Sequence, residues 1–212
     1  MDEPLNNSAE WEALRPKLIT SSQFHRVLND MGMSKRGMEF GTGAIRYALE
    51  IACFMLTGEP PKEKSSAEIE WGREHEEFAR QEYERIKFCT VQPGRLIRKP
   101  DTMIGASPDG FVGDDGLIEI KCPTSVVHLQ TLIDGNMPPY HKPQVQGQLW
   151  VTGRKWVDFV SYDPRFKDPD KRLFIKRIER EEVFITNMSM ILIRFQDFVL
   201  QMARHGQEST YR

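Results

Sequence analysis

The spacing of apolar residues along the chain changes twice and predicts three successive blocks of secondary structure. In the first block apolar side chains recur every three to four residues, which predicts helices over residues 9–15, 22–30, 42–57 and 65–86. In the second block the period shortens to about two and turn-forming Pro, Gly and Asp residues intervene, which predicts short strands over residues 90–91, 96–98, 103–106, 111–112 and 117–120. In the last block, helices over residues 143–152 and 181–202 enclose strands over residues 156–161 and 173–178.

This order of elements favours an α/β fold with a central mixed β-sheet flanked by helices. No repeat or linker divides the 212 residues, so residues 1–212 are expected to form a single domain, with residues 1–10 as a poorly ordered tail. We expect no apolar run long enough to cross a bilayer and find no signal-peptide pattern at the N-terminus, which favours a cytoplasmic protein without a membrane partner.

Composition adds two constraints. Cys53, Cys89 and Cys122 form no CxxC pair, which favours a reducing compartment and argues against structural zinc. The formal charge of −2 and the pI near 6.2 count mildly against a nucleic-acid binder, which usually carries a basic excess. A DNA-binding function therefore requires that basic residues gather along a groove while acidic residues cover the rest of the surface.

The candidate chemistry lies in Ser107-Pro108-Asp109-Gly110 and in Glu119-Ile120-Lys121, nine residues further on. Because side chains alternate along a strand, Glu119 and Lys121 project to the same face and can meet Asp109 there. Two carboxylates provide the hard oxygen ligands that suit Mg²⁺, and a lysine places positive charge near an attacked phosphate. The alternative is a turn-forming aspartate followed by solvated charges at a strand end.

Asp109-Gly110 with Glu119-Ile120-Lys121-Cys122-Pro123 resembles the core of the phage lambda exonuclease family, the YqaJ-type viral recombinase nucleases related to alkaline exonucleases. Further blocks follow in family order at residues 11–15, 19–22, 71–76, 144–146, 150–152 and 162–165. The resemblance implies a restriction-endonuclease-like fold with a PD-(D/E)xK core. It also implies a two-metal, Mg²⁺-dependent exodeoxyribonuclease that digests one strand of linear duplex DNA from its 5′ end to mononucleotides, leaving a 3′ single-stranded tail for recombination.

The resemblance also assigns roles around the cleaved bond. Asp109, Glu119 and the main-chain carbonyl of Ile120 are expected to hold two Mg²⁺ ions, with Mn²⁺ as an alternative. Lys121 and Glu76 are expected to act on the attacking water, with Glu77 as the second candidate for the acidic group. Gln146 is expected to position the water or the scissile phosphate, although Gln144 and Gln148 compete for that role.

For the DNA end, the resemblance implies that Arg15, Ser22 and Ser107 bind the 5′-terminal phosphate. Ile69 matches a position expected to wedge apart the terminal base pair, or else it packs inward as an ordinary helix residue. One departure concerns the arginine that the lambda member has shortly after Lys-Cys-Pro. Here the chain reads Thr-Ser-Val-Val-His, so either His128 or another basic residue supplies that charge, or the pocket is weaker.

The resemblance further implies a toroidal homotrimer that acts on double-stranded DNA ends together with a single-strand annealing protein. Two other functions remain open at this point. The same core is compatible with a structure- or sequence-dependent endonuclease, which activity on closed circular DNA would favour. A DNA-end-binding module without catalysis is the third hypothesis, and the intact Asp109, Glu119 and Lys121 set argues against it.

Overall fold

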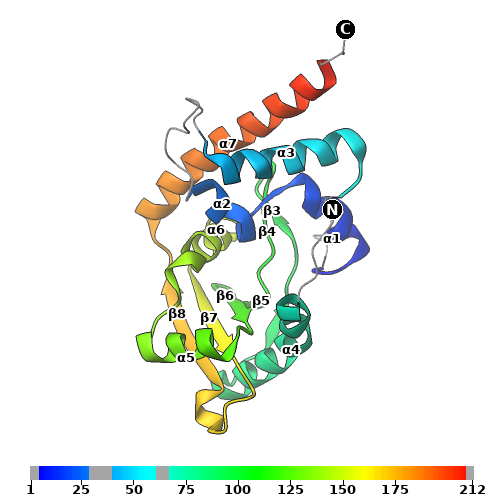
Figure 1. Cartoon of the computed structure of the whole chain (residues 1–212). Coiled ribbons are helices and arrows are strands. Elements are labelled where there is room, and N and C mark those ends of the chain that lie inside the picture. The colour runs from blue at the N-terminus through cyan, green and yellow to red at the C-terminus, as the bar shows by residue number, and fades with distance from the viewer. Residues whose placement is uncertain (1–4, 29–39, 61–66, 209–212) are drawn as a thin grey trace.

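The computed structural model describes residues 5–28, 40–60 and 67–208, and it confirms the expected mixed α/β domain (Figure 1). The larger sheet has five strands in the order β2-β5-β6-β7-β8. Within it β6 and β7 run parallel, whereas the other neighbours are antiparallel. The strands are β2 (Val91–Pro93), β5 (Gly110–Val112), β6 (Gly116–Lys121), β7 (Trp156–Tyr162) and β8 (Leu173–Glu179).

A second, three-stranded sheet ties the N-terminal segment to the centre of the chain. Its order is β1-β4-β3, with β1 parallel and β3 antiparallel to β4. The strands are β1 (Ile19–Thr20), β3 (Ile97–Arg98) and β4 (Ile104–Ala106). Because β4 leads directly into the segment that carries Asp109, this sheet places residues 5–20 beside the candidate site.

Helices cover both sheets (Figure 1). They are α1 (Ala9–Leu14), α2 (Phe24–Leu28), α3 (Thr42–Thr57), α4 (Ala67–Lys87), α5 (Ser125–Asp134), α6 (Lys142–Thr152) and α7 (Glu182–Glu208). Single 3₁₀ turns occupy Arg15–Lys17, Ser21–Gln23, Pro139–His141 and Pro169–Lys171.

The main hydrophobic core lies where α3 packs against α7. Tyr47 of α3 stacks on Phe195 of α7 with ring centroids 5.7 Å apart, and Leu192 is fully buried beside them. By length and composition alone α7 could cross a membrane, and it is the one helix among the described residues that could. A single helix of this kind is weak evidence for a membrane span, and in this fold α7 has a buried stripe formed by Ile185, Met188, Leu192, Phe195, Val199 and Ala203.

The two faces of β6 enter different cores, and this alternation positions the candidate site. Leu117 belongs to the core that includes Val145 and Leu149 of α6. Ile118 and Ile120 point the other way, into a smaller core with Tyr83 of α4. Glu119 therefore shares the face of Leu117 and is directed toward α6.

Most elements agree with the pattern in the sequence, but α5 was not predicted. Its buried side chains are the polar His128 and Thr131, whereas Val126, Leu129 and Ile133 are exposed. This reverses the usual relation between polarity and burial, so the apolar positions of this segment do not mark its buried face. The end of the helix expected over residues 22–30, most of the loop expected over residues 33–43, and residues 1–4 of the expected tail lie outside the described residues.

Candidate active site

Asp109 is held at the start of β5 by contacts from two distant parts of the chain. The Asn6 side-chain amide donates to the Pro108 carbonyl at 2.9 Å. Gly94 lies against the same turn so closely that a Cβ atom there would be 2.1 Å from the Pro108 oxygen. The Asp109 main-chain N–H donates to the Ile118 carbonyl at 3.2 Å. Its carboxylate Oδ2 accepts from the Ile120 N–H at 2.6 Å, which directs Asp109 onto β6 as the strand geometry predicts.

Glu119 is almost completely buried, with 1% of its side chain exposed. Buried carboxylates require charged or hydrogen-bonding partners, and both oxygens of Glu119 have them. Oε1 accepts from the Lys121 ammonium and from Gln144 Nε2, the latter at 2.5 Å. Oε2 accepts from Gln148 Nε2 at 2.5 Å. The structure thus brings Asp109, Glu119 and Lys121 together at the end of β6.

Glu76 of α4 completes a group of three carboxylates around one ammonium. Burial raises the pKa of Glu76, and the charge of Glu119 raises it further. Burial, then Glu119 and Glu76, raise the pKa of Asp109 well above its usual range. Burial alone would lower the pKa of Lys121, but Glu119 and Asp109 outweigh it, so the net shift is upward. The neighbouring Glu77 is exposed and pairs with Arg80 instead.

The donor chemistry of this cluster fits a hard divalent cation. Carboxylate oxygens are the ligands that Mg²⁺ prefers, and three acidic groups leave negative charge that a single lysine does not balance. No group of three His, Cys, Asp or Glu side chains across residues 5–28, 40–60 and 67–208 is arranged to hold a metal. The expected ligand set of two side chains, Asp109 and Glu119, and the main-chain oxygen of Ile120 stays a prediction.

Gln146, the glutamine expected at the site, is not brought to the carboxylates. Its Nε2 donates to the Glu179 carbonyl at 2.8 Å and its Oε1 accepts from the Glu181 N–H at 2.9 Å. Gln146 therefore joins α6 to the connection between β8 and α7. Gln144 and Gln148, which lie one helical turn apart on the other side of α6, contact Glu119 instead, so the position expected for Gln146 belongs to them.

The residues expected to bind the terminal phosphate are linked through Trp11. The Trp11 indole N–H donates to the Ser107 hydroxyl at 3.1 Å, and the Arg15 guanidinium lies over the Trp11 ring, 4.7 Å from its centroid. Arg15 Nη2 also lies 3.4 Å from the Ser22 hydroxyl. Trp11 belonged to a family-like block in the sequence, but its link to Ser107, 96 residues away, had no sequence signal.

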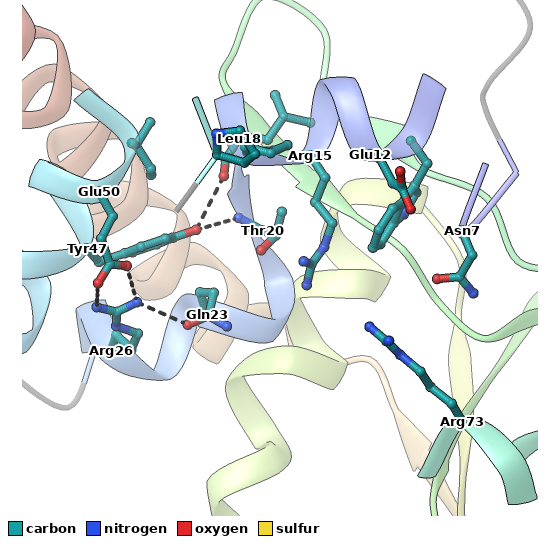
Figure 2. Close-up of a pocket in the computed structure, with 14 residues that line it drawn as sticks. Asn7, Glu12, Arg15, Leu18, Thr20, Gln23, Arg26, Tyr47, Glu50 and Arg73 are labelled. Carbon is teal, nitrogen blue, oxygen red and sulfur yellow. Dashed lines mark hydrogen bonds and ion pairs between the residues drawn. The ribbon is translucent and has the colours of Figure 1, made fainter. Parts of the chain in front are cut away.

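Arg15 projects into a cavity of about 710 Å³ between the N-terminal segment, α3 and α4. Figure 2 shows the Arg73 side chain of α4 extending into this space toward Arg15. On the opposite side Tyr47 and the Arg26–Glu50 ion pair line the wall, with the Tyr47 hydroxyl accepting from the Thr20 N–H at 3.0 Å. The cavity is lined by Asn7, Trp11, Glu12, Arg15, Pro16, Leu18, Thr20, Gln23, Arg26, Tyr47, Glu50, Ile51, Pro60 and Arg73.

Two further expectations concern the same region. His128, considered as a replacement for the family arginine, is fully buried on α5, and its ring nitrogens contact the Ser161 hydroxyl at 2.7 Å and the Lys171 carbonyl at 2.8 Å. It is therefore not available to a phosphate. Ile69 is 45% exposed on the first turn of α4, one turn before Arg73 and on the same side of the helix.

The chain is similar to known proteins in sequence and in structure. The sequence profile of the YqaJ-like viral recombinase domain matches residues 10–155. No curated protein matches the chain.

Among solved structures, the alkaline exonuclease LHK-Exo from Laribacter hongkongensis is 34% identical over 95% of this chain and 97% of its own, with a TM-score of 0.84. LHK-Exo in complex with dAMP is 34% identical over 95% of this chain and 99% of its own, with a TM-score of 0.81. A phage-related exonuclease from Haemophilus somnus is 18% identical over 89% of this chain and 96% of its own, with a TM-score of 0.66, and shares the fold.

Proposed function

The chain belongs to the YqaJ-like viral recombinase family, and on this basis we propose that it is a Mg²⁺-dependent exodeoxyribonuclease acting on the 5′ ends of linear duplex DNA. The observation that carries the proposal is the cluster of Asp109, Glu119 and Glu76 around Lys121, in which Glu119 is buried and the other three are half-buried. This cluster lies in a chain 34% identical to an alkaline exonuclease over 95% of its length. That relative has been crystallised with dAMP, which supports release of 5′-mononucleotides here.

The cation would be held by the carboxylates of Asp109 and Glu119 and by the Ile120 carbonyl, with two ions per site and Mn²⁺ as an alternative. When bound it would supply Lewis acidity at the scissile phosphate. Lys121 Nζ donates to the attacking water and stabilises negative charge that develops on the phosphate. Glu76 is suited to accept the proton of that water, because a carboxyl with a raised pKa is the better base near neutral pH.

Gln144 takes over the positioning role expected of Gln146. Its side chain is half-buried and donates to Glu119 Oε1, the same oxygen that Lys121 contacts. An amide at this point can hold Glu119 in place and can also donate to water or a phosphate oxygen after a small movement. Gln144 is therefore proposed as part of the catalytic group, and Gln146 as a structural residue.

Selectivity for 5′ ends is proposed to come from Arg15, Ser22 and Ser107, with Arg73 as the additional cation. Guanidinium groups bind phosphate through paired hydrogen bonds, and Arg15 and Arg73 extend into one cavity from opposite sides (Figure 2). Arg73 thereby replaces the arginine that the lambda member has after Lys-Cys-Pro. Ile69, one turn earlier on α4, is proposed as the wedge that separates the terminal base pair.

The digestion product with a 3′ single-stranded tail, the homotrimer, the annealing-protein partner and the cytoplasmic location remain proposals that rest on family membership. Light scattering of the purified protein measures the oligomeric state, and a mass of three chains is expected. Quantifying the released nucleotides and the protected strand during digestion tests the product.

The proposed activity is tested by digesting linear and covalently closed circular duplex DNA in Mg²⁺ and in chelator. We expect cleavage of linear DNA alone, and only with the cation. Cleavage of circular DNA would support the endonuclease alternative, and end binding without cleavage would support the non-catalytic module.

Polarity is tested on otherwise identical linear duplexes with 5′-phosphate or 5′-hydroxyl ends. Charge-assisted hydrogen bonds contribute about 1.5–3 kcal/mol each, which corresponds to roughly tenfold or more in rate. Arg15→Ala is expected to remove most of this preference by slowing the phosphorylated substrate. Arg85→Ala is the matched control, because Arg85 lies at the far end of α4 and pairs with Glu82. Equal rates for both ends in the wild type would contradict the 5′ assignment.

A further inference from the structure

Gln148 of α6 has a fully buried side-chain amide, and among residues 5–28, 40–60 and 67–208 this amide makes a single hydrogen bond, which goes to Glu119. Its Nε2 donates to Glu119 Oε2 at 2.5 Å, and none of its surface is exposed. Within the described part of the chain, its other polar atom, Oε1, has no hydrogen-bond partner. Rotating the amide by 180° would direct its oxygen at a carboxylate, so Glu119 alone determines its orientation.

The two oxygens of Glu119 are consequently held in different ways. The partners of Oε1 are Lys121 and Gln144, which are only half-buried, and the Lys121 side chain is 31% exposed. Both can move aside and be solvated. Gln148 cannot reach solvent from its position, so any ligand that took Oε2 would leave a buried amide without a partner, which is costly.

We propose that Gln148 is a positioning residue that makes Glu119 a one-oxygen ligand and thereby biases the site toward Mg²⁺ over Ca²⁺. Mg²⁺ takes six ligands in a near-octahedral arrangement and is satisfied by one carboxylate oxygen together with waters. Ca²⁺ takes six to eight oxygens at longer distances and often binds both oxygens of one carboxylate. The hydrogen bond from Gln148 to Oε2 prevents Ca²⁺ from binding the second oxygen of Glu119, whereas Mg²⁺ binding does not require that oxygen. This inference rests on the proposed metal-dependent function of the same site.

The test is Gln148→Met in the full-length protein, with Mg²⁺ and Ca²⁺ binding measured by calorimetry in the absence of DNA. Methionine keeps the length and volume of glutamine and removes the donor. We expect the ratio of Ca²⁺ to Mg²⁺ affinity to rise at least tenfold over the wild type, which is about 1.4 kcal/mol. The matched control is Gln146→Met, which removes the same amide two residues away, where it bonds to Glu179 and Glu181 main-chain atoms. The control should leave the ratio unchanged.

Infrared difference spectra of the Ca²⁺-loaded proteins provide a readout that a purely structural role would not change. The separation of the carboxylate stretching bands differs between one-oxygen and two-oxygen ligation, and only the Gln148→Met protein should show the two-oxygen form. Should that variant fail to fold, Gln148→Asn serves the same purpose, because its shorter amide cannot reach Glu119.

The possible failures are distinguishable. An unchanged affinity ratio in a folded Gln148 variant, or two-oxygen Ca²⁺ ligation already in the wild type, would overturn the role of Gln148 and leave the metal site standing. Absence of both Mg²⁺ and Ca²⁺ binding in the wild type would instead overturn the proposed metal-dependent function, and this inference with it.

Discussion

Replacing Asp109 by asparagine is expected to stabilise the protein in chelator at alkaline pH, although the same change removes a proposed metal ligand. Burial, Glu119 and Glu76 raise the pKa of Asp109 well above its usual range. Between the ordinary aspartate pKa and this raised value, the folded state keeps a proton that the unfolded chain releases. Stability therefore falls as pH rises through that interval and stays low above it. Asparagine has no charge to lose and keeps an oxygen for the Ile120 N–H.

The size of the expected stabilisation depends on how much of the Asp109 negative charge is left without a favourable partner in the folded protein. Its carboxylate has one main-chain hydrogen bond, two acidic neighbours and Lys121, which Glu119 already engages. Relief of an imperfectly satisfied buried group is worth about 1–3 kcal/mol. For a chain of this length each kcal/mol shifts Tm by about 2–4 °C, so we expect a Tm increase of roughly 2–12 °C at pH 8. The increase should shrink as pH falls toward 4, because the wild-type carboxyl keeps its proton in the folded state there and the unfolded chain also begins to bind one.

The assay is thermal unfolding followed by circular dichroism between pH 4 and pH 8.5, in chelator and then in Mg²⁺. Mg²⁺ at 100 times its Kd should stabilise the wild type by about 2.7 kcal/mol and the variant much less, which removes or reverses the difference. Asp158→Asn is the control, because this substitution of a buried aspartate is expected to lower the stability of the protein. Asp158 is fully buried and accepts from Arg177 at 2.8 and 2.9 Å and from Tyr83 at 2.8 Å, so its replacement should cost about 2–4 kcal/mol. A destabilised Asp109→Asn protein at pH 8 in chelator would refute the argument.

Four further substitutions test other parts of the structure. Lys121→Ala should slow cleavage by about 10²–10³-fold while calorimetry still detects cation binding, and full turnover would remove the assigned role. Gln144→Ala should lower kcat at least about tenfold and leave the melting curve near normal. Gln146→Ala should instead lower the free energy of unfolding by about 1–3 kcal/mol and leave kcat of the folded enzyme unchanged. The reverse pairing would restore the original expectation for Gln146. Gly147→Ala places a Cβ 2.5 Å from the Phe24 ring and should lower the free energy of unfolding in denaturant by about 1–3 kcal/mol. An unchanged unfolding midpoint would show that α2 can shift to accommodate the methyl group at little energetic cost.

The strand that carries the proposed catalytic residues could be predicted because its information is local. Alternation along β6 places Glu119 and Lys121 on one face, and the turn at Pro108 and Gly110 supplies Asp109, as the hydrogen bonds of the structure bear out. The strand order β2-β5-β6-β7-β8 could not be predicted from the sequence, because β6 and β7 pair in parallel although α5 and α6 separate them along the chain. The mixed α/β class itself was confirmed.

The choice among the three glutamines of α6 shows why part of the site could not be predicted. Residues four apart share a helix face, so Gln144 with Gln148 and Gln146 with Trp150 were equally consistent with the sequence. The rotation of α6 about its axis decides between them, and burial of Val145 and Leu149 against the main core sets that rotation. No feature of the helix alone reports which side faces Glu119.

The contacts between the N-terminal segment and the turn that carries Asp109 have a consequence for protein synthesis. Trp11 and Ser107 are separated by 96 residues, and Asn6 and Pro108 by 102. At about 5–20 residues per second, Trp11 is synthesised roughly 5–20 s before Ser107. Gln144 and Gln148, the partners of Glu119, are made later still. Chains released early from the ribosome therefore lack part of the candidate site. The complete site can form only after most of the chain has been translated.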